Sequence, residues 1–260
     1  MFEKILLVYS ERITKNHLDT VGRIKEIIEK TRRKCSLAKA SDLQANLFDN
    51  VDLVITVGGD GTFIRASHYL SDIPILGINS EPGISEGALI SVSDSELSRL
   101  EEILNGNYNI IRRSRIEVRR NGVILDKLAL NDVYIGSLNQ FHTSRYAVRF
   151  QGKEEEQRSS GVLIATSSGS NAWYKSAGGK PFPYEEQELK FLVREPYSGR
   201  LFQPKILAGE IKPGEKIAFV SKRYTGGVIA LDSDAVYEFN NNDEAEIRLS
   251  DKPLNVLVKK

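Results

Sequence analysis

Three stretches of this sequence gather the small and polar residues that suit a phosphorylated or hydroxylated ligand. They are the turn Gly58–Thr62 (GGDGT), the pair Asn131-Asp132 and the run Thr166–Gly179. Each follows directly on an apolar segment, which is where a binding loop emerges from a buried element. The three stretches are therefore the first candidates for chemistry in this chain.

The glycine turn combines an anion-binding backbone with one carboxylate. Glycine reaches positive φ and lets a ligand approach the backbone, and a helix beginning here adds unpaired N–H groups and its positive dipole end. We therefore predict that Gly58, Gly59 and Gly61 bind phosphate. An acid in such a cradle opposes anion binding, so Asp60 is expected to have another task, although it can also simply cap the helix. No Lys follows the glycines, which excludes a Walker A loop.

The run from Thr166 to Gly179 is rich in hydroxyl side chains and glycine, and it opens a short predicted helix at Ser170–Ala177. Hydroxyl and backbone N–H groups at a helix start suit phosphate or ribose oxygens. Trp173, the only Trp of the chain, can stack on a flat ring. A polar loop with a core Trp explains the same residues equally well.

The pair Asn131-Asp132 has the groups needed to hold a diol. A carboxylate accepts hydrogen bonds from two hydroxyls, and an amide both donates and accepts. An Asx turn explains the pair equally well.

Strand and helix patterns alternate around the glycine turn. Such alternation predicts a parallel sheet covered on both faces, which binds ligands at the carboxyl ends of its strands, where the turn lies. We therefore predict an α/β domain over residues 1–106 that carries the turn. The predicted strands are Lys4–Tyr9, Cys35–Ala38, Val51–Val57 and Pro74–Asn79, and the predicted helices are His17–Lys30, one after the turn, and Asp94–Leu104.

Beyond Asn107 the pattern changes to short, often alternating segments rich in β-branched and aromatic residues, separated by turn signals. Residues 107–260 are therefore predicted to form an antiparallel β-rich domain, whose C-terminal tail can return to the first domain. The charged run Lys153–Glu156 is predicted to be an exposed hairpin tip. Segments of this kind, predicted to be strands, include Tyr108–Arg120, Val123–Ala129, Asp132–Ile135, Ser144–Phe150, Gly161–Thr166, Lys216–Ser221, Gly227–Leu231 and Ala235–Phe239.

Composition narrows the class of protein and its partners. The 260 residues are 40% apolar and 27% charged, which is ordinary for a globular chain with a sizeable core. Lys and Arg (36) nearly equal Asp and Glu (35), so neither nucleic acid nor an acidic membrane is expected as a partner. The apolar runs are strand-sized, and so no membrane span is predicted.

Cysteine and histidine usage bears on compartment and metal binding. A single cysteine, Cys35, suits a reducing compartment, and the start of the chain leads straight into a predicted strand rather than a signal peptide. A cytoplasmic protein is therefore expected. The three histidines, His17, His68 and His142, have no metal-ligand spacing with one another or with Cys35, so no protein-built metal cage is predicted.

Taken in this order, the three polar stretches resemble the NAD kinase family. Gly58–Thr62 resembles its signature turn, Asn131-Asp132 resembles its Asn-Glu pair, and Thr166–Gly179 resembles its second long motif, usually T-P-T-G-S-T-A-Y-S-x-S-A-G-G. The resemblance covers Val51 to Phe239. The divergent branch that includes the mitochondrial NAD kinases of animals is suggested by Gly77–Pro82 with Ser85–Gly87, by Arg158–Gly161, by Ala172-Trp173, and by Arg194–Pro196 with Arg200.

The resemblance implies ATP-dependent phosphorylation of the 2′-hydroxyl of the adenosine ribose of NAD to give NADP, by a two-domain homodimer or homotetramer. Asp60 would be the general base, and Gly58–Thr62 would contact the phosphates of NAD or ATP. Mg²⁺ or another divalent cation would accompany ATP, held mostly through phosphate oxygens and water. The NAD-binding residues implied are Gly61, Thr62, Asn131, Asp132, Thr166, Ser170, Asn171, Trp173 and Asp232.

The sequence also departs from the family pattern. Glu81-Pro82-Gly83 stands within the usual G-x-N-x-G-x-L-G-F stretch, and Asp132 is one methylene shorter than the usual Glu. Two other classes stay open: a lipid kinase of the diacylglycerol or sphingosine type, which shares GGDGT, and a non-catalytic NAD-binding sensor. The Thr166–Gly179 motif speaks against the first and Asp60 against the second. The donor (ATP or polyphosphate) and the preference between NAD and NADH stay open as well.

Overall fold

The computed structural model describes residues 2–201 and 203–260, and the chain divides into two compact units. One unit comprises the chain up to Arg113 together with Pro253–Lys260, and the other comprises Ser114–Lys252. Strand β6 (Tyr108–Arg113) falls in the first unit because it pairs antiparallel with the last strand, β19 (Leu254–Lys259). The division therefore lies at residue 113, a few residues beyond the predicted position.

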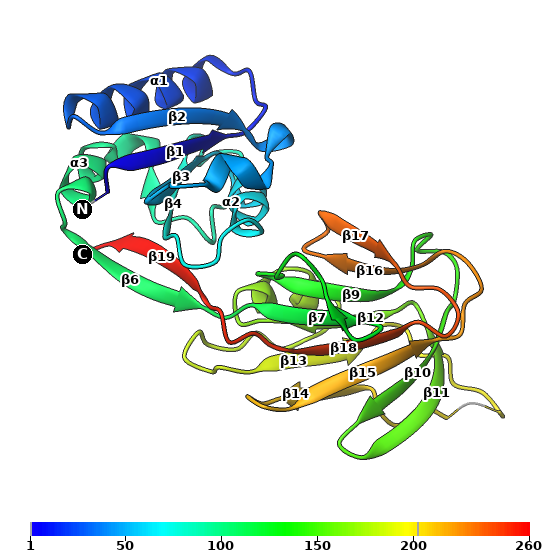
Figure 1. Ribbon diagram of the computed structural model, residues 1–260. Helices are drawn as coiled ribbons and strands as arrows, with labels where there is room; N and C mark the ends of the chain where they lie inside the picture. The colour runs from blue at the N-terminus through cyan, green and yellow to red at the C-terminus, as the bar shows by residue number, and fades with distance from the viewer. Residues whose placement is uncertain (1, 202) are drawn as a thin grey trace. The chain divides into compact units, whose positions relative to one another are not determined.

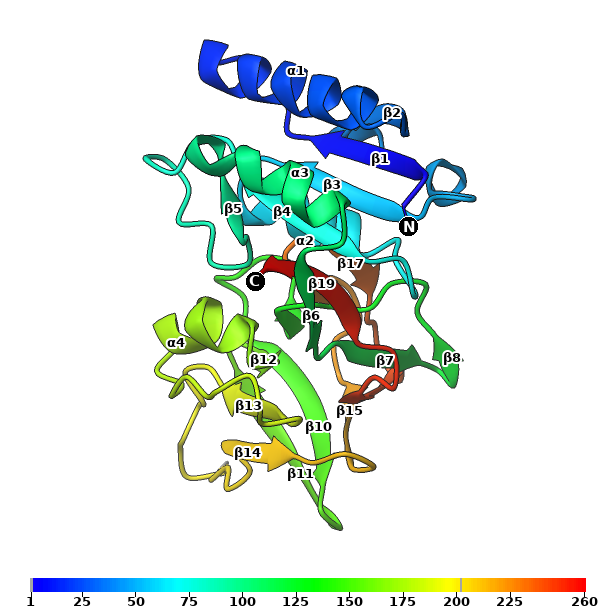
Figure 2. The same ribbon diagram turned by 90° about the vertical axis from the view of Figure 1, so that its left-hand side faces the viewer.

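The first unit is built on a mostly parallel sheet with the strand order β2-β1-β3-β4-β19-β6 (Figure 1), and β5 pairs with β4 (Figure 2). Strands β3 and β4 are buried along their whole length, as expected for parallel strands with both faces covered. The strands predicted here are confirmed to within two residues at each end. Their bounds are β1 Lys4–Tyr9, β2 Lys34–Lys39, β3 Leu53–Val57 and β4 Ile75–Asn79. A further short strand that was not predicted, β5, covers Val92–Ser93.

Helices cover both faces of this sheet. Helix α1 (Lys15–Lys30) and helix α3 (Ser98–Leu104) pack together on one face (Figure 2), against alternate residues of β1 such as Ile5 and Leu7. Helix α2 (Asp60–Ser67) contacts β1 and β3. The predicted helix at 94–104 begins as a 3₁₀ turn, which Ser93 and Glu96 close with a capping box, and continues as α3. The short 3₁₀ turns are η1 Ala40–Asp42, η2 Ala45–Phe48 and η3 Asp94–Glu96.

The second unit holds two antiparallel sheets among its described residues, with the orders β11-β10-β15-β18-β7-β8 and β14-β13-β12-β9-β16-β17. Apolar residues of both sheets, among them Ile164 and Phe219, form one shared core. The bounds are β7 Ile116–Arg120, β8 Val123–Ile124, β9 Asp132–Ser137, β10 Ser144–Phe150, β11 Lys153–Ser159, β12 Val162–Ala165, β13 Leu189–Val193, β14 Ala208–Ile211, β15 Lys216–Ser221, β16 Gly227–Leu231, β17 Ala235–Glu238 and β18 Glu244–Leu249, with η4 Gly169–Asn171 and α4 Trp173–Ser176 between β12 and β13.

Four local predictions beyond Asn107 are wrong in whole or in part. The segment Val123–Ala129 is a strand only over β8, and the predicted helix Ser170–Ala177 is divided into η4 and α4. The charged run Lys153–Glu156 is not a hairpin tip but the start of β11, and the turn itself is Gln151-Gly152, where both residues have positive φ. The segment Tyr108–Arg120 is not one strand: it splits at Ser114 into β6 and β7, which belong to different sheets. The alternation of apolar and polar residues continues across Ser114, and so the sequence pattern does not reveal that the chain passes there from the first unit to the second.

Candidate active site

The glycine turn joins β3 to α2 and uses its glycines in two ways. A side chain at Gly58, whose φ is +149°, would place its Cβ 2.7 Å from the Thr62 hydroxyl and 3.1 Å from Ser10 Cβ. A Cβ at Gly59 would likewise collide with the Ser85 side chain. At Gly61 nothing lies within 4 Å of the place where a Cβ would stand. The first two glycines thus allow close packing, while the third leaves the start of α2 open to a ligand.

Asp60 is the first residue of α2, and its carboxylate reaches the loop that follows β4. Oδ1 accepts a hydrogen bond from Leu89 N (2.9 Å) and Oδ2 accepts one from Ala88 N (3.0 Å). These bonds fix the orientation of the half-buried carboxylate, and each oxygen retains a further lone pair. An oriented carboxylate beside an open helix start can accept a proton from a hydroxyl group brought to the turn.

The loop after β4 contains Glu81-Pro82-Gly83, and the structure gives Glu81 a clear task. The buried carboxylate accepts hydrogen bonds from the Thr14 hydroxyl (2.6 Å) and from Arg12 Nη1 (2.8 Å). These two bonds, the Thr14 bond first, lower the pKa of Glu81 below its ordinary value. Glu81 therefore stays ionised and ties the loop after β1 to the loop after β4.

His17 lies within the same group of polar residues and is fully buried. Its Nδ1 is 2.8 Å from the Ser80 hydroxyl, and its Nε2 is 3.1 Å from the Ser10 carbonyl oxygen. Burial lowers the pKa of the imidazole. His17 is thus a neutral, hydrogen-bonded side chain that packs the β1 and β4 loops together.

In the second unit, Asp232 organises the start of β9. Its carboxylate accepts hydrogen bonds from the backbone N–H groups of Leu130 (2.7 Å), Asn131 (2.7 Å) and Asp132 (3.0 Å). Asp232 itself has a φ of +53°. Three N–H groups on one carboxylate form an anion-binding nest that is already filled by the protein. Asp232 therefore fixes the conformation of the Asn131-Asp132 pair.

The pair held by Asp232 presents two unusual polar groups. The amide oxygen of Asn131 is buried and has no hydrogen-bond partner among the described residues. The Asp132 side chain is only 5% exposed, and this burial, together with the neighbouring Asp232 carboxylate, raises the pKa of Asp132 to about 7. An unsatisfied buried acceptor costs free energy unless a ligand supplies the donor. The pair is thus suited to bind hydroxyl groups.

The hydroxyls of the Thr166–Gly179 run mostly hold the loop itself. Thr166 donates to the Leu130 carbonyl oxygen (2.6 Å) and accepts from Gly169 N (3.2 Å). Ser170 donates to the Ser167 carbonyl oxygen (2.8 Å) and accepts from Phe182 N (3.2 Å). Because Thr166 and Ser170 are fully buried, any part they take in ligand binding is indirect.

Trp173 is half-buried and packed between polar and aromatic neighbours, whereas Asn171 is exposed. The Trp173 ring stacks on Tyr134, with ring centroids 5.4 Å apart and planes at 27°. The Arg194 guanidinium lies 5.1 Å from the Trp173 ring and donates to Gln140 Oε1 (2.9 Å). Trp173 is therefore a ring of fixed orientation rather than a freely exposed one.

The predicted site residues thus form one group in each unit. The glycine turn lies in the first, and the second brings together Asn131, Asp132, Thr166, Ser170 and Asp232. The sequence reasoning missed the partners of several motif residues, above all Arg12 for Glu81 and Arg194 for Trp173. Among residues 2–201 and 203–260, no group of three or more His, Cys, Asp or Glu side chains is placed to hold a metal ion, and no helix is both long and apolar enough to cross a membrane.

Solved structures share this fold. An NAD kinase from Archaeoglobus fulgidus, solved in complex with ATP, matches with a TM-score of 0.77 and 24% identity over 98% of this chain and 93% of its own. Yeast NADH kinase, complexed with NADH, matches with a TM-score of 0.78 and 15% identity over 100% of this chain and 84% of its own. The predicted fold class, an N-terminal α/β sheet followed by antiparallel sheets, is confirmed as the NAD kinase fold.

Sequence comparison then identifies the family. Residues 4–104 match the model of the ATP-NAD kinase N-terminal domain. A probable NADH kinase from Oryza sativa subsp. japonica is 32% identical over 272 residues, which cover 96% of this chain and 83% of the rice protein. The chain belongs to the NAD kinase family.

Proposed function

We propose that this protein is an NAD(H) kinase, which transfers the terminal phosphoryl group of ATP to the 2′-hydroxyl of the adenosine ribose of NAD or NADH. The observation that carries the proposal is the Asp60 carboxylate, held by two backbone N–H groups beside the open start of α2. Family membership supplies the reaction class, a phosphotransfer to an alcohol. A non-catalytic sensor has no evident use for an oriented acid at a phosphate-binding turn.

In the proposed reaction, the ribose 2′-oxygen attacks the γ-phosphorus of ATP, the bond to the β,γ-bridging oxygen breaks, and ADP leaves. Asp60 accepts the proton of the 2′-hydroxyl. The N–H groups of Gly59–Gly61 bind phosphate oxygens, because phosphoryl transfer needs positioning and charge stabilisation more than covalent help from the protein. The Gly58 N–H, which the sequence also assigned to phosphate, is instead donated to the Ile78 carbonyl oxygen (3.0 Å). A divalent cation bound mainly through the phosphate oxygens of ATP would neutralise part of the charge of the triphosphate.

We assign the second unit the role of binding the dinucleotide. The unpartnered Asn131 oxygen and the Asp132 carboxyl accept hydrogen bonds from ribose hydroxyls, while Asn171 and Trp173 provide polar and aromatic contacts. Thr166, Ser170 and Asp232 act by holding these groups in place. In the first unit, Gly61 contributes to NAD binding through its backbone, while the buried Thr62 supports the turn by donating its N–H to the Gly59 carbonyl oxygen (3.1 Å).

Four finer assignments are part of the proposal. The rice relative is named a probable NADH kinase, and the yeast structure contains NADH, which favours NADH as an acceptor here too. The Arg158–Gly161 and Arg194–Pro196 motifs favour the branch that includes mitochondrial NAD kinases of animals, and the family resemblance favours a homodimer or homotetramer. A cytoplasmic location fits Cys35, the only cysteine of the chain.

The test is an endpoint assay that pairs ATP or polyphosphate with NAD or NADH and measures NADP or NADPH. We expect product with ATP and at least one of the two dinucleotides. Phosphorylation of diacylglycerol with labelled ATP, without any NADP(H), would instead support a lipid kinase. Tight NAD binding with no product in any pairing would support a sensor.

A further inference from the structure

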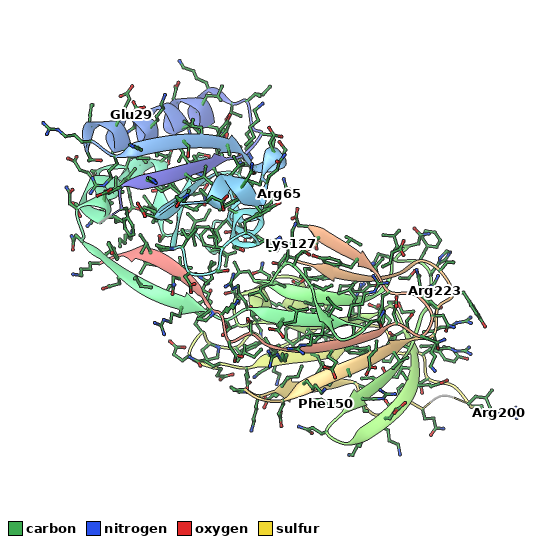
Figure 3. The ribbon with its side chains drawn as sticks, viewed as in Figure 1. Glu29, Arg65, Lys127, Phe150, Arg200 and Arg223 are labelled. Carbon is green, nitrogen blue, oxygen red and sulfur yellow. The ribbon has the colours of Figure 1, made fainter. Side chains whose placement is uncertain are left out.

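The loop Ser10–Thr14, which follows β1, lies against the glycine turn. Ser10 N donates to the Val57 carbonyl oxygen (3.0 Å), and Ser10 Cβ would be 3.1 Å from a Cβ at Gly58. Glu11 pairs with Arg65, which extends from α2 (Figure 3), at 3.7 Å. Strands β1 and β3 are parallel neighbours, so their carboxyl ends meet at the same edge of the sheet. The loop therefore forms one side of the phosphate-binding turn.

Arg12 is held in this loop by Glu81. The Glu81 side chain is only 7% exposed, and Arg12 Nη1 is 2.8 Å from its Oε2. The Glu81 N–H in turn donates to Asn79 Oδ1 (3.0 Å), which secures the acid at the end of β4. A charge-assisted bond to a buried, anchored carboxylate restricts the guanidinium far more than a surface ion pair does.

The guanidinium retains most of its hydrogen-bonding capacity. It carries five N–H donors, of which the bond to Glu81 uses one. The Arg12 side chain remains 35% exposed, and within residues 2–201 and 203–260 its guanidinium has no hydrogen-bond or ion-pair partner other than Glu81. Arginine presents these donors in a planar fork that matches phosphate oxygens.

We propose that Arg12 binds phosphate oxygens of ATP at the glycine turn, with Glu81 as the residue that positions it. The inference rests on the proposed function, because it needs ATP at this turn. It gives the turn a fixed cation for the charge of the triphosphate. It also gives a reason for Glu81, which belongs to the segment where this sequence departs from the usual family pattern. The Glu81 carboxylate fixes the position of the Arg12 guanidinium.

The experiment compares steady-state kinetics of Arg12→Ala, Arg12→Lys and Glu81→Gln with the wild-type protein, varying ATP and NAD(H) separately. Loss of a charge-assisted contact to phosphate should raise the KM for ATP about tenfold or more in Arg12→Ala. Arg12→Lys should show a smaller rise, because Lys keeps the charge without the fork. Glu81→Gln should also raise the KM for ATP. The KM for NAD(H) should stay within about twofold for all three, since the contact is made to ATP alone.

The matched control is Arg99→Ala, which breaks an exposed Arg99–Glu102 pair (3.4 Å) on α3 of the same unit and should leave both KM values unchanged. A wild-type KM for ATP in Arg12→Ala would overturn the inference. So would equal rises in both KM values with a lowered Tm, because Arg12 would then only hold the loop. If Arg12→Ala does not fold, Arg12→Lys and Glu81→Gln decide on the same criteria. A wild-type protein that forms no NADP(H) would overturn the proposed function itself, and the inference with it.

Discussion

The glycine turn of the first unit and the Thr166–Gly179 run of the second are both rich in small polar residues, yet the structure uses them differently. At the turn, Gly61 leaves open space at a helix start. In the run, the hydroxyls of Thr166 and Ser170 are fully buried and bonded to backbone groups. The first region leaves room for a ligand, whereas in the second region these hydroxyl groups form hydrogen bonds that stabilise the loop itself. Small polar residues in a motif thus do not all mark direct contacts.

The aspartates of the two regions differ in the same way. Asp60 is oriented by two N–H groups and remains beside open space, whereas Asp232 fills a nest of three N–H groups. Asp132 is buried and close to Asp232, which leaves its proton poised near neutral pH. We therefore expect substitutions at Asp232 to act on structure first and substitutions at Asp60 to act on turnover.

The largest effect on stability is expected from Asp232→Ala. Removing the carboxylate leaves three N–H groups of residues 130–132 without their acceptor. The loss should lower the free energy of unfolding by about 2–4 kcal/mol and raise the KM for NAD(H). Chemical denaturation and steady-state kinetics check both. An unchanged free energy of unfolding with a raised KM would mean that Asp232 contacts the dinucleotide directly.

Alanine substitutions at Gly58 and Gly61 should change the free energy of unfolding by smaller and different amounts. Gly58→Ala places a side chain at φ +149° against Thr62 and Ser10 and should cost about 1–3 kcal/mol of unfolding free energy. Gly61→Ala meets nothing within 4 Å and should be neutral or stabilising by up to about 1 kcal/mol. Its methyl group should nevertheless raise the KM for ATP. A Gly61→Ala variant with normal kinetics would show that phosphate does not approach there.

A separate effect is a pH dependence of stability that comes from Asp132. Its folded pKa of about 7 lies above its ordinary value of 3.8, so the folded state binds this proton more tightly than the unfolded state. The stability contribution is complete below about pH 4 and is lost as the pH rises towards 7. Asp132→Asn should therefore flatten the dependence of Tm on pH, with the largest gain over wild type above pH 7. Parallel Tm curves for the two proteins would contradict the raised pKa.

The sequence predicted local structure well where apolar periodicity was continuous, as in β3 and α1, because both faces of the parallel sheet are buried. It missed β11, whose inward side chains include Gln157 and Ser159, both buried and hydrogen-bonded to the Tyr146 hydroxyl (3.0 and 2.8 Å). A strand with polar residues facing inward lacks the apolar alternation that reveals strands.

The candidate site was predictable as motifs but not as contacts. The Arg12–Glu81 pair joins residues 69 positions apart, and Asp60 reaches Ala88 and Leu89 across 28 and 29 positions. Such pairings depend on which strands are neighbours in the sheet, and local patterns do not encode that. The motifs also could not distinguish the buried Ser170 from the exposed Asn171.

The central claim, that Asp60 is the base of a dinucleotide kinase, is tested most directly by the turnover of Asp60→Asn against Asp52→Asn. Asp52 immediately precedes β3, at the end of the strand away from the glycine turn. Its carboxylate also accepts two backbone N–H hydrogen bonds, from Glu3 (2.9 Å) and Lys4 (2.8 Å), so the two variants disturb a similar pattern of hydrogen bonds. We predict that Asp60→Asn folds and lowers kcat for NADP(H) formation by about 10²–10⁴-fold, while Asp52→Asn keeps wild-type kcat. A folded Asp60→Asn variant with near-wild-type kcat would contradict the account.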